Sequence, residues 1–302
     1  MVLSQIFYVM LIVFAILTIS ASCLKHAIIL DSVFGLWASV TYLLYHAPDV
    51  SISEAVVSST LGTILFVLTI RRYSDINLPP FRSLLRARLG ATFLLVTVCA
   101  LLIFYTLQTP GLGLAPLQVA AMEAYIAGRR IVSPITSILL SWRGFDTLFE
   151  ATLLLIAVLA VVHLTDTKQN QASSCYMAVN ESHPTIRTSV RTLVPFFCVI
   201  AAALIAGDPF TPGGGFQGGG ILAAIIVGRY LIRPYSGSRT EDMQKIEKFV
   251  FILFILSLIA YVLLDVRNVG NYPGFMIFMN SLLGIKVFCG LSIIFLYFAA
   301  EE

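Results

Sequence analysis

Long apolar runs separated by short polar segments make up most of this 302-residue chain. Each run comes close to the roughly 20 residues that a helix needs to cross the hydrocarbon core of a bilayer. The pattern therefore predicts an all-α integral membrane protein with about nine transmembrane helices. The predicted spans are 3–24, 27–45, 54–70, 89–107, 147–164, 193–206, 218–232, 249–266 and 278–299.

The first and the middle runs need separate comment. The run 3–24 is too long for the apolar part of a signal peptide, lacks a basic segment before it and is followed at once by another span, so we expect a retained helix. The runs 193–206 and 218–232 are short, and either could extend into the glycine-rich segment between them. Composition agrees with a membrane protein, because 58% of the residues are hydrophobic, 12% are charged and the mean hydropathy is +0.92.

The loops carry the information on orientation. Lysine and arginine concentrate in 71–88, 166–191 and 229–248, which fall on one side of the membrane if the N-terminus is outside. The positive-inside rule then places the C-terminus in the cytoplasm. Three arginines disagree, but they lie in the long outer segment 108–146, where charges weigh less. The net charge of +3 is spread over loops between spans, so we expect a lipid bilayer and no nucleic acid as partner.

Two polar segments resemble linkers in composition and divide the chain. The segment 71–88 contains Pro79-Pro80, and 166–188 contains Gln169-Asn170-Gln171. We therefore predict a three-helix module at 1–74, a two-helix module at 75–166 and a four-helix module at 167–302. Modules joined by cytoplasmic linkers suggest fused subunits.

The glycine-rich segment 207–220 lies between two predicted helices, where glycine would ordinarily weaken a helix. Without a Cβ atom, glycine permits positive φ and lets another backbone come close. We therefore predict a helix-packing motif rather than an ion site. Its members are Gly213, Gly214, Gly215, Gly218 and Gly219.

A few charged residues fall inside or beside the predicted spans. A charge at the centre of a membrane helix costs about 2.5–3.5 kcal/mol on insertion scales, so each needs a partner, water or a function. Asp31 and Lys286 lie deepest, which favours a buried pair or a hydrated relay. Carboxylates nearer the helix ends could instead cap helices or reach the interface. The candidates for an ion or proton relay are Asp31, Asp49, Glu54, Asp146, Glu150 and Lys286.

Enzyme signatures are missing from the sequence. The five cysteines form no Cys-x-x-Cys pair and the four histidines do not pair at helical spacing, which argues against metal, haem and iron–sulfur sites. We also find no nucleotide-binding loop and no convincing Ser/His/Asp set. We therefore predict no catalytic, metal or cofactor-binding residue, and a chain that is not an enzyme by itself.

Three stretches of sequence point to one family. Residues 47–55, Ala-Pro-Asp-Val-Ser-Ile-Ser-Glu-Ala, resemble the small C-terminal domain of the A subunit of Mrp-type Na⁺/H⁺ antiporters and its stand-alone counterpart in membrane-bound hydrogenases. Residues 133–150, with Arg-Gly-Phe-Asp-Thr, are similar to the signature that follows that domain, and Pro-Gly-Gly-Gly-Phe at 212–216 resembles the antiporter B subunit (MnhB-like). The order of the three stretches also matches consecutive subunits of the family.

The match to the family pattern is incomplete. Ser141 stands where the signature has aspartate, and Phe149 where it has glycine, so one usual charge is missing. Asp208 replaces a histidine of antiporter B subunits, and Gln217-Gly218 replaces an Ile-Ala pair. These last two differences favour the hydrogenase and related respiratory complexes over the stand-alone antiporter.

The resemblance implies one membrane subunit of a multisubunit cation/proton-translocating complex in the plasma membrane of a prokaryote. Its partners would be other membrane subunits, including large antiporter-like ones, and a hydrogenase-like redox arm could drive it. In that setting, charge logic makes Glu54 and Glu150 relay carboxylates, Lys286 their counter-charge and Arg143 a partner for Asp146. The glycines would bring a neighbouring subunit close.

Two other functions stay open from the sequence. The chain could be a structural subunit that only scaffolds and seals the same assembly. It could also be a self-sufficient secondary transporter, although the modules show no inverted repeat of the kind that brackets a substrate site at the membrane midplane.

Overall fold

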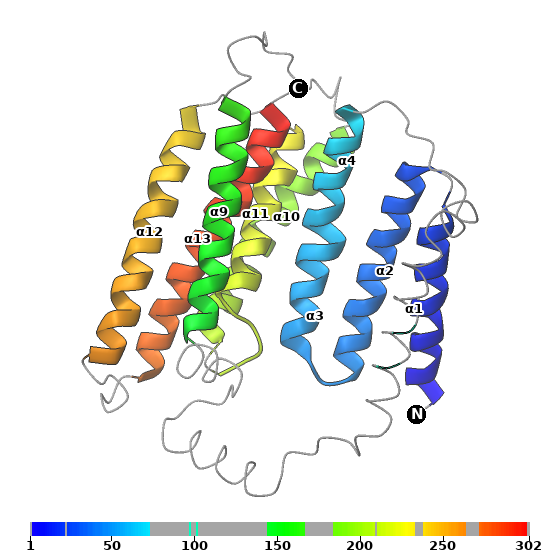
Figure 1. Ribbon diagram of the computed structural model, residues 1–302, viewed down its shortest axis with the longest axis horizontal. Helices are drawn as coiled ribbons and strands as arrows, with labels where there is room; N and C mark the ends of the chain where they lie inside the picture. Colours follow the sequence, from blue (N-terminus) through cyan, green and yellow to red (C-terminus); the bar gives the residue numbers. More distant parts are fainter. Residues whose placement is uncertain are drawn as a thin grey trace, which may run out of the picture.

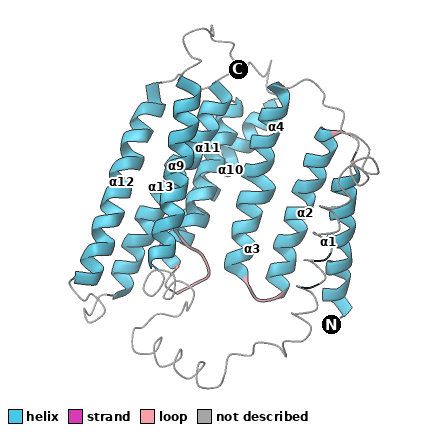
Figure 2. Ribbon diagram, viewed as in Figure 1, coloured by secondary structure: helices cyan, strands magenta, loops and turns pink. Residues whose placement is uncertain are grey.

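The computed structural model describes residues 2–21, 23–72, 97, 101, 144–166, 184–208, 210–232, 238–263 and 272–300. Every element in this part of the chain is a helix, as the apolar runs predict (Figure 2). The helices are α1 (Val2–Ser20), α2 (Leu24–Leu44), α3 (Pro48–Glu54), η1 (Ala55–Gly62), α4 (Thr63–Arg72), α9 (Gly144–Asp166), α10 (Pro184–Gly207), α11 (Gly215–Ile232), α12 (Ser238–Leu263) and α13 (Tyr272–Ala300).

The helices form two neighbouring groups (Figure 1). In one group, α1 and α2 pack as a pair beside the continuous rod of α3, η1 and α4. In the other, α9 to α12 pack around α13. α1 begins at the end of the bundle opposite to the end where α13 finishes (Figure 1).

α13 is the centre of the larger group. In the most apolar part of α13, 67% of the residues are buried inside the chain. In the other four long apolar helices, that share is 22% or less. Those other helices keep large apolar side chains exposed, as expected of surfaces that face lipid or further membrane subunits.

η1 is a π-helix in the middle of the rod. Thr60 Oγ1 donates to the carbonyl of Ala55, five residues earlier, at 3.0 Å, and Ser59 Oγ donates to the same carbonyl. Such widened turns are often found at functional sites because they shift the helix register. Here the widened segment faces α2 on one side and α11 on the other.

Five helices in the described residues are long and apolar enough to cross a membrane, namely Leu24–Leu44, Pro48–Val67, Asp146–Leu164, Arg187–Gly207 and Pro273–Phe298. The chain is therefore a multi-pass helical membrane protein. The predicted span 89–107 falls almost entirely outside the described residues, so the total of about nine helices stays a prediction, as do the module boundaries.

Two predicted boundaries are wrong. The rod begins at Pro48 rather than at residue 54, because proline fits the first turn of a helix and starts it early. α12 begins at Ser238, although the charged segment 229–248 reads as a loop. Its polar residues belong to a helix that continues into the apolar run.

Glycines let α11 and α13 come unusually close. A Cβ atom on Gly219 would lie 2.5 Å from the carbonyl oxygen of Gly284, and one on Gly215 would collide with the carbonyl of Asn280. Gly218 is packed against Ala201 and Ile205 of α10 in the same way. The glycines thus contact helices of the same chain, whereas the sequence suggested contact with a neighbouring subunit.

Candidate functional site

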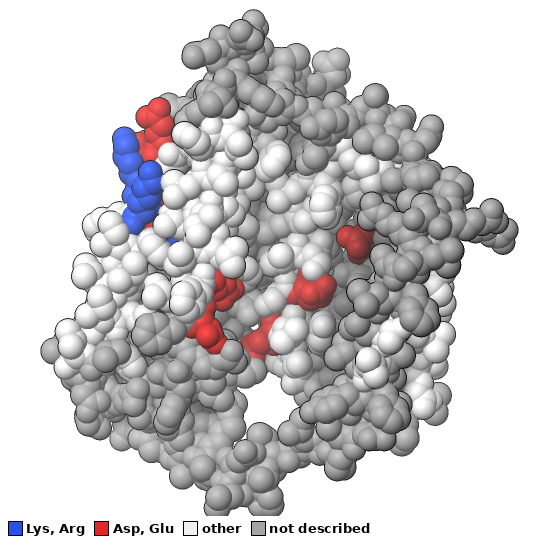
Figure 3. Space-filling view, viewed as in Figure 1, with Lys and Arg blue, Asp and Glu red and all other residues white. Residues whose placement is uncertain are grey.

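An acidic pocket lies where the two helix groups meet. It has a volume of about 400 Å³ and is bounded by α3, α9, the start of α13 and the loop between α10 and α11. Three carboxylates line it: Asp49, Glu150 and Asp208. Acidic side chains gather near the middle of the described surface, and basic side chains lie at one edge (Figure 3).

Asp49 joins the two helix groups. It is held in the first turn of α3, and its Oδ1 accepts a hydrogen bond of 2.7 Å from the backbone N–H of Gly213. Only 8% of Asp49 is exposed, so this charge-assisted bond is shielded from water. The bond connects residues 164 positions apart in the chain.

Gln217 makes a second connection at the same place. Its Nε2 donates to Ser53 Oγ at 3.0 Å and, more weakly, to the carbonyl of Asp49 at 3.4 Å. Gln217 lies in the first turn of α11, directly after the glycine loop. The start of α11 is thereby fixed to α3.

The glycine loop itself is shaped by one special conformation. Gly214 has φ +150°, which side chains other than glycine rarely adopt, and a Cβ there would also press on Gln217 Oε1. The loop carries Asp208, which is 3% exposed and accepts a short hydrogen bond from Asn280 Nδ2 of α13. Asp208 thus ties the loop to the central helix.

Glu150 forms the wall of the pocket on α9. Its side chain is exposed within the chain, and so is that of Asp146 one turn earlier. In the described residues, no three acidic, histidine or cysteine side chains come close enough to hold a metal ion. The carboxylates line a wide pocket.

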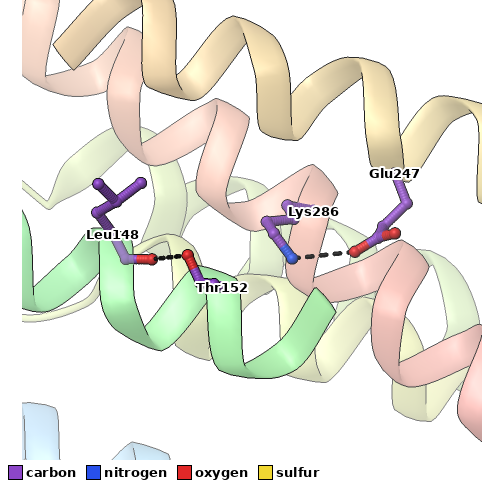
Figure 4. Close-up of polar contacts among 4 residues, drawn as sticks. All are labelled: Leu148, Thr152, Glu247 and Lys286. Atoms are coloured by element: carbon purple, nitrogen blue, oxygen red, sulfur yellow. Dashed lines mark hydrogen bonds and ion pairs between the residues drawn. The ribbon is translucent and has the colours of Figure 1, made fainter. Parts of the chain in front are cut away.

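A buried ion pair lies farther along α13. Lys286 Nζ is 3.0 Å from Glu247 Oε1 of α12, and both side chains are 0% exposed. The close-up shows Lys286 extending from α13 toward Glu247 (Figure 4). The ammonium group also lies 5.2 Å from the ring centre of Phe251, so a second group balances part of its charge.

The structure separates the residues predicted as a relay. Asp49 and Glu150 line the pocket, and Lys286 is buried in the ion pair. Glu54 instead accepts a hydrogen bond of 2.7 Å from Ser58 on its own rod. Asp31 lies on a face of α2 that is exposed within the chain, so its role in a buried pair or a hydrated relay stays a prediction. Arg143, the suggested partner of Asp146, lies outside the described residues.

Four polar residues of these sites were not predicted as site residues from the sequence: Glu247, Asp208, Gln217 and Asn280. The first was hidden by its charged neighbours, although helical spacing places it on one stripe with Met243, Val250 and Phe254. Asp208 and Gln217 looked like family differences only. Asn280 has no signal, because a single amide in an apolar run is ordinary.

We predict that Asp49→Leu lowers the free energy of unfolding by about 1–3 kcal/mol, because the buried N–H of Gly213 loses its acceptor. Asp49→Asn keeps an acceptor oxygen and should lose clearly less. Thermal melts of the purified protein in one detergent measure the difference. Equal losses for the two variants would show that the Gly213 bond contributes little.

Two family models match separate parts of the chain. Residues 9–75 match the MbhD family, which represents one of the subunits of MBH, and residues 185–297 match a domain related to the MnhB subunit of Na⁺/H⁺ antiporters. The chain thus carries one segment related to MbhD and one related to MnhB. Asp49 belongs to its MbhD segment, and Gly213, Gln217, Glu247 and Lys286 belong to its MnhB-related segment.

A curated relative extends this comparison. The putative antiporter subunit mnhA2 of Staphylococcus aureus is 29% identical over 140 residues, which are 45% of this chain and 17% of the relative. The same protein matches in several strains of that species. The chain therefore aligns with only about a sixth of the length of these relatives.

Two solved structures share the fold. The Mrp complex from Dietzia sp. DQ12-45-1b matches 99% of this chain and 35% of its own chain, with a TM-score of 0.78 and 18% identity. A chain of the membrane-bound sulfane sulfur reductase, an archaeal respiratory membrane complex, matches 72% of this chain and 99% of its own, with a TM-score of 0.59 and 23% identity. At these identities the likeness concerns the fold.

Proposed function

We propose that this protein is a membrane subunit of a multisubunit complex that translocates cations and protons, and that it contributes charged groups to the ion path. One observation carries the proposal: Lys286 and Glu247 form an ion pair with no exposed surface inside two packed membrane helices. The relatives add support, since they are antiporter and respiratory complex subunits by name.

The energetics of the pair favour a role beyond packing. Removing each ion from water costs several kcal/mol, and apolar residues of similar volume often serve a core as well or better. A subunit that only scaffolds would gain nothing from keeping Lys286 in the middle of its longest helix and Glu247 on the helix beside it. Ionisable groups buried between membrane helices are typical of ion and proton pathways.

The acidic pocket and the ion pair share one helix. Asn280, which holds Asp208, precedes Lys286 by six residues, or about 9 Å along the axis of α13. Charges roughly 10 Å apart interact by about 1.7 kcal/mol at an effective dielectric constant near 20. A cation that enters the pocket among Asp49, Glu150 and Asp208 would therefore change the electrostatic energy of the Lys286–Glu247 pair.

The proposal includes the setting of the chain. Large antiporter-like subunits and other membrane subunits would cover the exposed apolar faces, and the chain itself would bind no cofactor and catalyse no reaction. The basic loops favour an outside N-terminus and a cytoplasmic C-terminus. A hydrogenase-like arm, where the complex has one, would be carried by other subunits.

A double variant tests whether the pair serves transport. Lys286→Met combined with Glu247→Leu removes both charges while keeping apolar volume, so the complex should assemble. We expect ion-driven proton movement in proteoliposomes to fall at least about tenfold, in line with the loss of a positioned proton-transfer group. Ser281→Ala on the same helix is the control, because the Ser281 hydroxyl donates to the carbonyl of Ile277 within α13.

The outcome separates the two functions. Full transport by an assembled complex carrying the double variant would favour the scaffold. Isolation of the wild-type chain as an active transporter without other subunits would contradict a multisubunit assembly.

A further inference from the structure

One oxygen of the buried ion pair is left over. Glu247 Oε1 contacts Lys286, but Oε2 has no hydrogen-bond partner among the described residues, although Glu247 is 0% exposed. Natural proteins satisfy nearly all such buried polar atoms, commonly through internal water. An isolated carboxylate oxygen thus marks a place suited to water.

The nearest end of the bundle is only a short distance away. Asp242 and Lys245, near the start of α12, have side chains that are 73% and 75% exposed, which marks an aqueous end. Glu247 follows Asp242 by five residues, or about 7.5 Å along the helix. The buried pair lies close to this surface.

A polar contact lies between Glu247 and the aqueous end of the bundle. Gln244 Nε2 donates a hydrogen bond of 2.7 Å to Tyr297 Oη of α13. Gln244 lies on the same side of α12 as Glu247 and about 4.5 Å nearer the aqueous end. Tyr297 follows Lys286 by 11 residues, close to three full turns, so both project from one face of α13. Side chains of a helix tilt toward its N-terminus, so the hydroxyl points back toward the pair.

The interface is apolar on the other side of the pair. There α12 and α13 meet through Val250, Phe254 and Met279, all buried. Along α12 in that direction, the next polar contact is at Ser257, whose hydroxyl donates to the carbonyl of Phe254 and to the sulfur of Met279. Among the described residues of α12, the polar contact nearest to Glu247 is therefore that of Gln244, toward the end where the helix begins. On α13, the Asn280 contact with Asp208 lies on the opposite side of Lys286.

We propose that Glu247 exchanges protons with the aqueous phase where α12 begins and α13 ends, through water bonded to its free Oε2 and through the Gln244–Tyr297 contact. This inference rests on the proposed function. In the inward step, a hydronium ion gives its proton to Oε2, so that the carboxylate becomes a neutral acid and water remains. The outward step reverses it. The ionisable groups beside this carboxylate in the described part of the chain are Lys286 and Cys289 of α13.

The first test measures proton movement in the complete complex. In proteoliposomes containing a pH-sensitive dye, Gln244→Leu and Tyr297→Phe should each slow ion-driven proton flux at least about tenfold, because positioned groups speed proton transfer by roughly 10²–10⁴-fold. Ser257→Ala, at the same helix interface but beyond the pair, should leave the flux unchanged. Wild-type flux in both variants would overturn the proposal, even where the Lys286/Glu247 double variant is inactive.

The second test does not depend on transport. With Cys289 kept as the only cysteine of the chain, Ag⁺ added on the side where α12 begins should block its later alkylation. Cys289 follows Lys286 by three residues on α13, and its cluster packs against Met243 of α12. A chain whose only cysteine is Ser257→Cys provides the buried comparison. If Ag⁺ blocks Cys289 no faster than it blocks the Ser257→Cys thiol, water does not reach the ion pair from this side. The proposal would then be overturned, whatever the transport data show.

Discussion

Lys286→Met is expected to lower the free energy of unfolding by about 3–5 kcal/mol, because it leaves the buried carboxylate of Glu247 without its counter-charge. Even in its neutral form, that carboxyl would keep Oε1 among apolar side chains without the partner that Lys286 supplies. Thermal melts of the complex in lipid nanodiscs, followed by the loss of co-purifying subunits, would measure the change.

The double variant is the decisive comparison for this stability effect. Adding Glu247→Leu to Lys286→Met removes the stranded carboxyl and should recover most of the lost stability, since apolar replacement of a whole buried pair is often neutral or stabilising. If the single and double variants have the same melting temperature, the two charges are not strongly coupled. Glu247 would then find other partners when Lys286 is absent.

Gly219→Ala is expected to cost about 1–3 kcal/mol or more, because the added methyl group would lie 2.5 Å from the carbonyl oxygen of Gly284 and 2.9 Å from Val287 Cβ. Neither a backbone carbonyl nor the root of a side chain can move away easily. The two helices would have to separate, which also disturbs the nearby pocket. Melting temperature and co-purification of the complex report the effect.

Gly228→Ala on the same helix is the matched control. Its nearest neighbour is Val190 Cγ1 at 3.8 Å, an ordinary van der Waals distance. Alanine there should be neutral or stabilising by up to about 1 kcal/mol, because glycine weakens a helix interior. A similar loss at both positions would mean that helix propensity, and not close packing, governs α11.

The sequence is enough to predict the helices that are apolar along their whole length. The fold class, the close packing role of the glycines and the burial of Lys286 all follow from runs of apolar residues and from the cost of a charge within them. Asp49 and Glu150 were found as carboxylates beside span ends, and both line the pocket. These features depend on short stretches of chain.

The features of the site that were not predicted from the sequence depend on contacts between distant segments. Asp49 and Gly213 are 164 residues apart, and no local pattern reports that they meet. Glu247 was missed because a helix that begins in water and ends in the membrane has a charged first part, which hydropathy reads as a loop. Helical spacing from Val250 and Phe254 back to Glu247 was the available signal.

The Asp49–Gly213 bond also has a consequence for assembly. It joins the MbhD segment to the MnhB-related segment, and both segments are parts of one polypeptide. Because one chain carries both segments, they need not find each other by diffusion through the membrane. Every molecule synthesised therefore supplies these two segments in equal number, and neither can be inserted without the other.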